Sequence, residues 1–140
     1  MSFSFTLHQD AALTLPVTGT LVFNGDLTSP APMDKELWFG SPVTASKCQA
    51  VSNPGVDQIA LSVADSAPAS GEPASAIKLA LTQAGLASAK GSASLNLGVT
   101  VNSDAANAVP VWVRFTDTTG SLGTYTDLSL SFNNLVESAQ

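Results

Sequence analysis

Residues 109–115 read Val-Pro-Val-Trp-Val-Arg-Phe, and this stretch decides the fold class. Val or Phe occupies every odd position, whereas Trp112 and Arg114 fall on even positions. Side chains of an extended strand point alternately to opposite faces. A period of two therefore predicts a strand with one face in a core and the other toward solvent. On this pattern we expect Trp112 on the outer face.

The same period of two returns along the chain and predicts a series of short strands. They cover residues 3–8, 17–23, 35–40, 43–51, 58–64, 76–82, 92–102, 109–117 and 125–136. Leu13 and Leu15 are expected to continue the first strand, and Ile77, Leu79 and Leu81 to share one face of another. Residues 79–89 also fit a short helix, because Ala, Leu and Gln favour that state; we prefer the strand.

Turn signals separate these strands at intervals of ten to fifteen residues. Asn24-Gly25-Asp26 and Asn53-Pro54-Gly55 are two examples, because Asn and Gly tolerate positive φ and Pro ends a strand. Sequential antiparallel strands with one wet face stack into two sheets. The sequence thus predicts an all-β, antiparallel two-sheet sandwich. We expect immunoglobulin-like architecture, with a jelly roll as the alternative.

The composition fits one domain over residues 1–140, because a chain of this size buries enough surface to fold unaided. The formal net charge is −6, and only 11% of the residues are charged. The basic residues are scattered along the chain: Lys35, Lys47, Lys78, Lys90 and Arg114. Binding of nucleic acid needs a basic footprint that displaces counterions from phosphates. We therefore expect no nucleic-acid partner and no anionic membrane partner.

The N-terminal residues carry neither the positive charge nor the continuous apolar run of a signal peptide. No stretch approaches the roughly 18 apolar residues of a membrane span. The expected place of synthesis is the cytoplasm of the producing cell. Cys48 is the only cysteine, and we expect it to act as a small buried apolar residue rather than as a reactive thiol.

The sequence predicts no catalytic residues, no cofactor and no metal ligands. His8 is the only imidazole and is expected to be an exposed bystander on the polar side of its strand. Asp34 and Glu36, two residues apart, share a strand face and resemble a glycosidase pair, but solvated acids of this kind are common. Whether Asp104 and other loop acids bind Ca²⁺ stays open, because no Asp-x-Asp-x-Asp run occurs. We therefore expect a protein that is not an enzyme.

Two groups of apolar side chains are the candidate partner-binding residues. Trp38 lies opposite to the apolar face of its strand, as does Trp112. Three interpretations stay open: a place in the core or under a neighbouring loop or strand, a protein interface, or a sugar platform. The second group is Phe3, Phe5 and Leu7. Residues 1–9 either pair within their own sheet or form an arm that pairs with the edge strand of a neighbour.

Four segments resemble small structural proteins of tailed bacteriophages. They are Leu37-Trp38-Phe39-Gly40-Ser41-Pro42, Ser52-Asn53-Pro54-Gly55-Val56-Asp57-Gln58-Ile59, Leu95-Asn96-Leu97-Gly98 and Thr126-Asp127-Leu128-Ser129-Leu130. The resemblance implies an immunoglobulin-like sandwich that sits on the virion as a capsid decoration (cement) protein. The implied partner is the major capsid protein, and the implied assembly is a homotrimer or homodimer on the capsid surface. A tail or adhesin module that binds host-surface glycan is the alternative.

Overall fold

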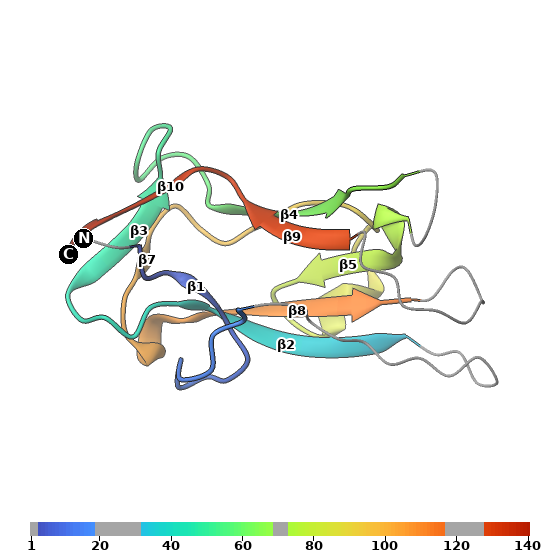
Figure 1. Cartoon of the computed structure of the whole chain (residues 1–140), viewed down its shortest axis with the longest axis horizontal. Coiled ribbons are helices and arrows are strands. Elements are labelled where there is room, and N and C mark those ends of the chain that lie inside the picture. Colours follow the sequence, from blue (N-terminus) through green and yellow to red (C-terminus); the bar gives the residue numbers. More distant parts are fainter. Residues whose placement is uncertain (1–2, 19–31, 69–72, 117–127) are drawn as a thin grey trace.

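One layer of the protein is a four-stranded antiparallel sheet. The computed structural model describes residues 3–18, 32–68, 73–116 and 128–140. The sheet has the order β1-β2-β8-β5, with bounds β1 (Thr6–His8), β2 (Met33–Gly40), β8 (Val109–Phe115) and β5 (Ile77–Ala80). β2 and β8 pair along almost their whole length and form its centre (Figure 1).

The opposite layer consists of two three-stranded sheets with matching strand orders. One has the order β10-β3-β7 and the other β9-β4-β6. Their bounds are β3 (Ser46–Ala50), β7 (Val101–Asn102), β10 (Leu135–Ala139), β4 (Ala60–Asp65), β6 (Leu95–Asn96) and β9 (Leu128–Phe132). The chain runs from β6 into β7 and from β9 into β10. Each edge strand of one sheet is therefore followed along the chain by the corresponding edge strand of the other. The two sheets therefore act as one layer with a bend, and β4 and β9 lie over the four-stranded sheet (Figure 1).

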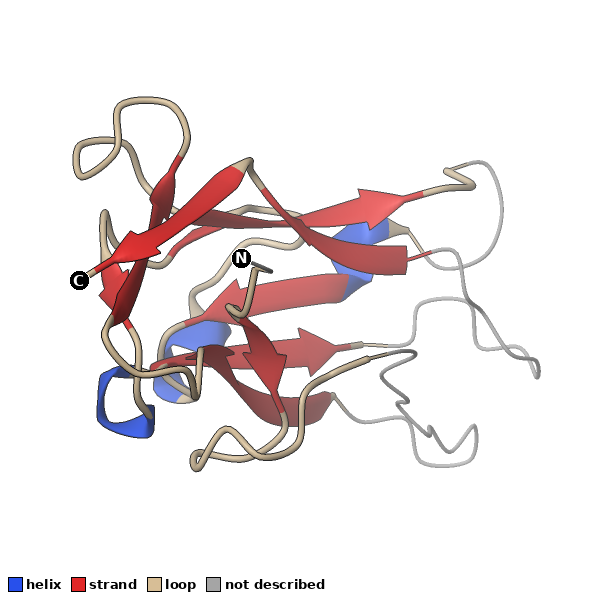
Figure 2. Cartoon of the chain, turned by 60° about the vertical axis from the view of Figure 1, so that its left-hand side comes forward, coloured by secondary structure: helices blue, strands red, loops and turns tan. Residues whose placement is uncertain are grey.

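Helical structure within the described residues is limited to three short 3-10 turns (Figure 2). They are η1 (Ala74–Ala76), η2 (Ala84–Ala87) and η3 (Ala105–Asn107). Residues 79–89 thus hold both expected alternatives in sequence, because β5 ends at Ala80 and η2 follows. Leu81 lies beyond the strand and is exposed, so the expectation that it shares the buried face of β5 is wrong.

The core lies between the two layers and is centred on Phe39. This side chain is 0% exposed, and its ring centroid lies 4.8 Å from that of Phe132 in the opposite layer. The ring centroid of Phe5 lies 6.0 Å from that of Phe39. Val111 and Val113 of β8 are buried beside them. The prediction of an all-β antiparallel sandwich is confirmed; the immunoglobulin-like and jelly-roll topologies stay predictions.

The expected continuous strand over residues 92–102 is instead two short strands in two sheets. Between them Gly98 has φ +113°, a left-handed conformation that suits glycine, and its N–H donates to Gln58 Oε1. Ile59 bonds to this connection from both sides, through Ile59 N to Gly98 O and Leu97 N to Ile59 O, each at 2.8 Å. The chain crosses the bend of the layer here, which interrupts the ladder without ending the alternation of buried side chains.

The last expected strand, residues 125–136, is divided in the same way. β9 ends at Phe132 and β10 begins at Leu135, and residues 125–127 lie outside the described part of the chain. Between β9 and β10, the Asn133 side chain bonds to the backbone at the start of β4. It accepts a hydrogen bond from Ala60 N and donates one to Gln58 O. These side-chain bonds replace ladder bonds where the strand changes sheet.

Leu13 and Leu15 do not continue the first strand, because the chain reverses at Asp10. The Asp10 carboxylate accepts hydrogen bonds from the amides of Thr14 and Leu15. This closes a loop, after which Val17 N donates to Leu7 O. Leu13 is buried within the loop and Leu15 is exposed. The expected strand 17–23 lies outside the described residues from position 19 onward.

Candidate functional site

The outer face of the four-stranded sheet brings the two tryptophans together. Trp38 on β2 lies opposite Pro110 on β8, and Glu36 on β2 lies opposite Trp112. Trp38 and Trp112 are therefore diagonal neighbours on one face, a spacing that large side chains bridge. Both are half-buried. We call Trp38, Pro110 and Trp112 the tryptophan platform.

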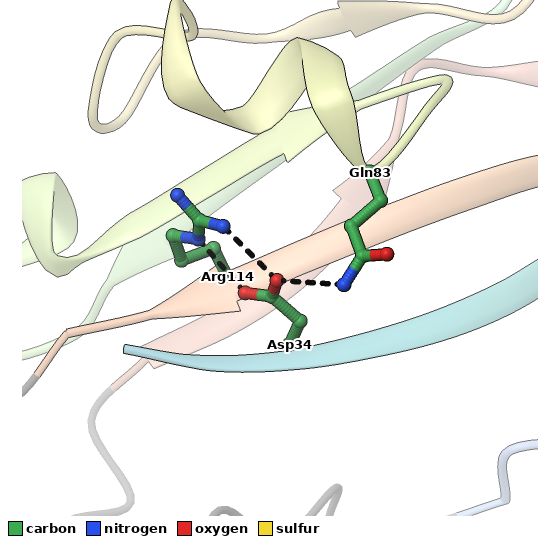
Figure 3. A network of polar contacts seen from close by, with 3 residues as sticks. All are labelled: Asp34, Gln83 and Arg114. Atoms are coloured by element: carbon green, nitrogen blue, oxygen red, sulfur yellow. Dashed lines mark hydrogen bonds and ion pairs between the residues drawn. The ribbon is translucent and has the colours of Figure 1, made fainter. Parts of the chain in front are cut away.

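An ion pair borders this platform on the same two strands (Figure 3). Arg114 Nε donates to Asp34 Oδ1 at 2.8 Å, and Arg114 Nη2 donates to Asp34 Oδ2 at 3.0 Å. Gln83 Nε2 adds a third bond to Asp34 Oδ2 at 3.2 Å. Two parallel bonds from a guanidinium fix both side chains in one geometry. The pair therefore gives the outer face a rigid polar border.

The Asp34 carboxyl belongs to this ion pair rather than to a pair of acids. The hydrogen bonds from Arg114 lower the pKa of Asp34, and they raise the pKa of Arg114 in turn. A general acid needs a raised pKa, which a neighbouring cation opposes. The expectation that Asp34 and Glu36 lie on one face is correct, but Asp34 has Arg114 as its partner.

The turn η2 covers the outer face beyond β8. It packs against β5 and β8, and its Leu86 is fully buried although it is not part of the core cluster between the two layers. Ala80, the register partner of Trp112 on β5, is buried as well. Gln83 starts this turn and ties it to β2 through Asp34. The covered area thus begins one strand away from Trp112, so the tryptophan lies at its border.

His8 lies beside Trp38 and is buried, so the expectation of an exposed histidine is wrong. Its side chain is 2% exposed, and Nδ1 lies 3.1 Å from Thr6 O. The reason is the reversal at Asp10: Pro16 bridges to His8 on the side opposite Trp38. His8 therefore has a paired chain on each side and is an interior residue of the sheet.

The candidate arm residues Phe5 and Leu7 belong to the core of their own chain. Both are buried, whereas Phe3 is 49% exposed. Ser4, which lies between Phe3 and Phe5, donates its amide to Glu137 Oε2 and its hydroxyl to Glu137 Oε1, each at 2.7 Å. In this conformation Phe3 alone of the three predicted arm residues presents a large surface to a partner.

Glu137 is a polar anchor that the sequence analysis did not identify. Burial raises the pKa of this carboxyl, but the two hydrogen bonds from Ser4, together with the nearby Ser46 hydroxyl, outweigh it and leave the pKa lowered. It lines a shallow pocket of about 400 Å³ together with Val43, Ala45 and Ala139. The sequence did contain a signal for this contact. Glu137 is a single acid on the inner face of the last strand, and a charge in that position needs a polar partner.

Cys48 is buried as expected, and burial followed by the charge of Glu137 raises its pKa to about 12. No three His, Cys, Asp or Glu side chains of the described residues are grouped to hold a metal ion. Within the same residues, no helix has the length and apolar character that a membrane crossing requires.

Comparisons with protein-family models, with curated proteins and with solved structures give no match to this chain.

Proposed function

We propose that the protein is a non-enzymatic structural protein of a tailed-phage virion, of the capsid decoration or cement type. It binds the outer surface of the head and bridges neighbouring subunits of the major capsid protein. A clamp of this kind adds buried interface that exists only in the assembled shell, so it stabilises the shell by mass action. The protein itself supplies no bond-making chemistry.

The observation that carries the proposal is the tryptophan platform. Tryptophan, tyrosine and arginine dominate the binding energy of protein interfaces, where they act from rigid positions. Trp38 and Trp112 come from the two central strands, whose pairing extends over β2 and β8, and the Arg114–Asp34 pair fixes the border. This rigidity lowers the entropy cost of association. The phage resemblance of residues 37–42, which include Trp38, favours a capsid protein as the partner.

A tail or adhesin module that binds host-surface glycan is the second candidate, and one observation favours it. Flat aromatic rings stack on sugars, and planar polar groups bond to sugar hydroxyls. The platform has both, because Trp112 lies next to Glu36 across the strands and the Asp34–Arg114–Gln83 network lies along the same face. The two candidates use the same surface but differ in the partner.

Replacing Trp112 by alanine is expected to weaken binding to purified heads that lack the protein by roughly 10- to 100-fold, the usual effect of truncating an interface aromatic. Occupancy is measured by co-sedimentation of the recombinant protein with the heads. Val56→Ala, which truncates a 71% exposed side chain on the loop between β3 and β4, serves as the matched control and should bind normally.

The same proteins are applied to a glycan array. Head binding that falls with Trp112→Ala, without glycan binding by the wild type, supports the decoration role. Glycan binding that the substitution abolishes, with no binding to heads, would establish the adhesin role instead. Unfolding by urea confirms that each variant is folded, so weak binding is not mistaken for misfolding.

A further inference from the structure

Among the strands that the structure describes, β9 lies at the edge of its sheet, with β4 on one side only. Asn133 N donates to Ala60 O, so in the alternating antiparallel pattern positions 129, 131 and 133 bond to β4. The N–H and C=O groups of Leu128, Leu130 and Phe132 therefore point away from β4. Among the described residues, no backbone group bonds to them.

The other layer protects both of its edges with its own chain. The edge of β1 is covered by the returning residues 15–17, through Gln9 N to Leu15 O and Val17 N to Leu7 O. The edge of β5 receives Ser92 N at Ile77 O. Proteins also blunt exposed edges with Lys, Pro or a bulge. The segment Leu-Ser-Leu-Ser-Phe of β9 contains neither Lys nor Pro and pairs with β4 without a bulge.

We propose that β9 is a self-association edge, on which β9 of a second copy pairs in antiparallel orientation about a twofold axis. The outward groups then form Leu130–Leu130 and Leu128–Phe132 hydrogen-bonded pairs between the copies. Ser129 of each copy lies opposite Ser131 of the other in a non-hydrogen-bonded pair, where side chains are closest. The β6-β4-β9 sheets of the two copies then join into one sheet of six strands.

The lack of charge along this edge favours a second copy as the occupant. The chain has a net charge of −6, so two copies repel each other at most contacts. Residues 128–136 form the longest part of the described edge and carry no charged side chain, so no like charges meet across the twofold pair. The inner residues of β9 are apolar and pack on the core, while Ser129 and Ser131 are exposed. The pair therefore continues an apolar inner face and a hydroxyl outer face across the two copies.

This inference deepens the proposed homo-oligomer, but it does not rest on attachment to a capsid. A dimer through β9 leaves the tryptophan platform free, because the platform lies on the outer face of the opposite layer. Loss of self-association and loss of head binding are therefore separate results.

The test places charges at the two serines. Ser129→Glu with Ser131→Glu sets like charges opposite each other at two sites between the copies, and we expect dimerisation to weaken roughly tenfold or more. Ser129→Lys with Ser131→Glu sets opposite charges at the same sites and should retain or strengthen the dimer. Ser52→Glu with Val56→Glu adds the same charge as the first variant on an exposed loop and should leave the dimer unchanged.

Sedimentation equilibrium over a range of concentrations measures the dimer of each variant, and circular dichroism with urea unfolding confirms the fold. The proposal predicts a concentration-dependent wild-type dimer that the two glutamates weaken and the Lys/Glu pair preserves. A wild type that stays monomeric at the highest concentration overturns it. So does a dimer or trimer that the Glu/Glu and Lys/Glu variants form equally well.

Discussion

Replacing Phe39 by alanine is expected to lower the free energy of unfolding by about 3–5 kcal/mol, the usual cost of truncating a buried phenylalanine. The side chain is fully buried, and its ring centroid lies 4.8 Å from that of Phe132 and 6.0 Å from that of Phe5. Removing it leaves a cavity between the two layers, which the sheets cannot close without losing their register. Urea unfolding followed by tryptophan fluorescence measures the change.

Phe3→Ala is the matched control, because Phe3 is half exposed and lies at the end of the same row of rings. Its truncation should lower the free energy of unfolding by only about 1 kcal/mol, since about half of the side chain is already in water. Equal costs for the two substitutions would contradict the placement of Phe39 at the centre of the sandwich.

The second large effect is expected for Gly91→Ala. A Cβ at this position would lie 2.2 Å from Ser75 O and 2.9 Å from Ser75 C, and backbone atoms cannot rotate away. The close approach of Gly91 to Ser75 matters because the next residue, Ser92, donates to Ile77 O and covers the edge of β5. We expect the substitution to lower the free energy of unfolding by about 3 kcal/mol, at the upper end of overpacking effects. Thermal or urea unfolding measures it.

Gly85→Ala supplies the comparison. Its added Cβ would meet Thr82 Oγ1 at 3.0 Å and Ala80 Cβ at 3.2 Å, both side-chain atoms, and alanine favours the helical turn η2. We expect the free energy of unfolding of Gly85→Ala to change by no more than about 1 kcal/mol. If Gly91→Ala were equally mild, residues 75 and 91 would not approach as closely as the structure has them.

The individual strands were predictable because their alternation is local. β8, β4 and β2 show the period of two directly, and the buried positions Val111, Leu61 and Leu37 are those that the pattern assigns to the inner face. The division of residues 92–102 between two sheets was not predictable in this way. It depends on where the layer bends, and Ile59 sets that bend through bonds to a segment about 40 residues away.

The candidate site was predictable only in part, for the same reason. The sequence places Trp38 and Trp112 on the outer faces of their strands, but their proximity depends on the register of β2 against β8. That register joins residues more than 70 positions apart and is fixed by packing of the whole sheet. The burial of His8 and the Ser4–Glu137 contact also depend on chain reversals that the alternation does not encode.

Cryo-electron microscopy of the virion shows whether this sandwich adheres to a phage head. We expect density for the two-layered domain at repeated positions on the outer capsid surface, with the Trp38–Trp112 face against major capsid subunits. Copies found only in the tail or at a fibre, or a particle without the protein, would contradict it.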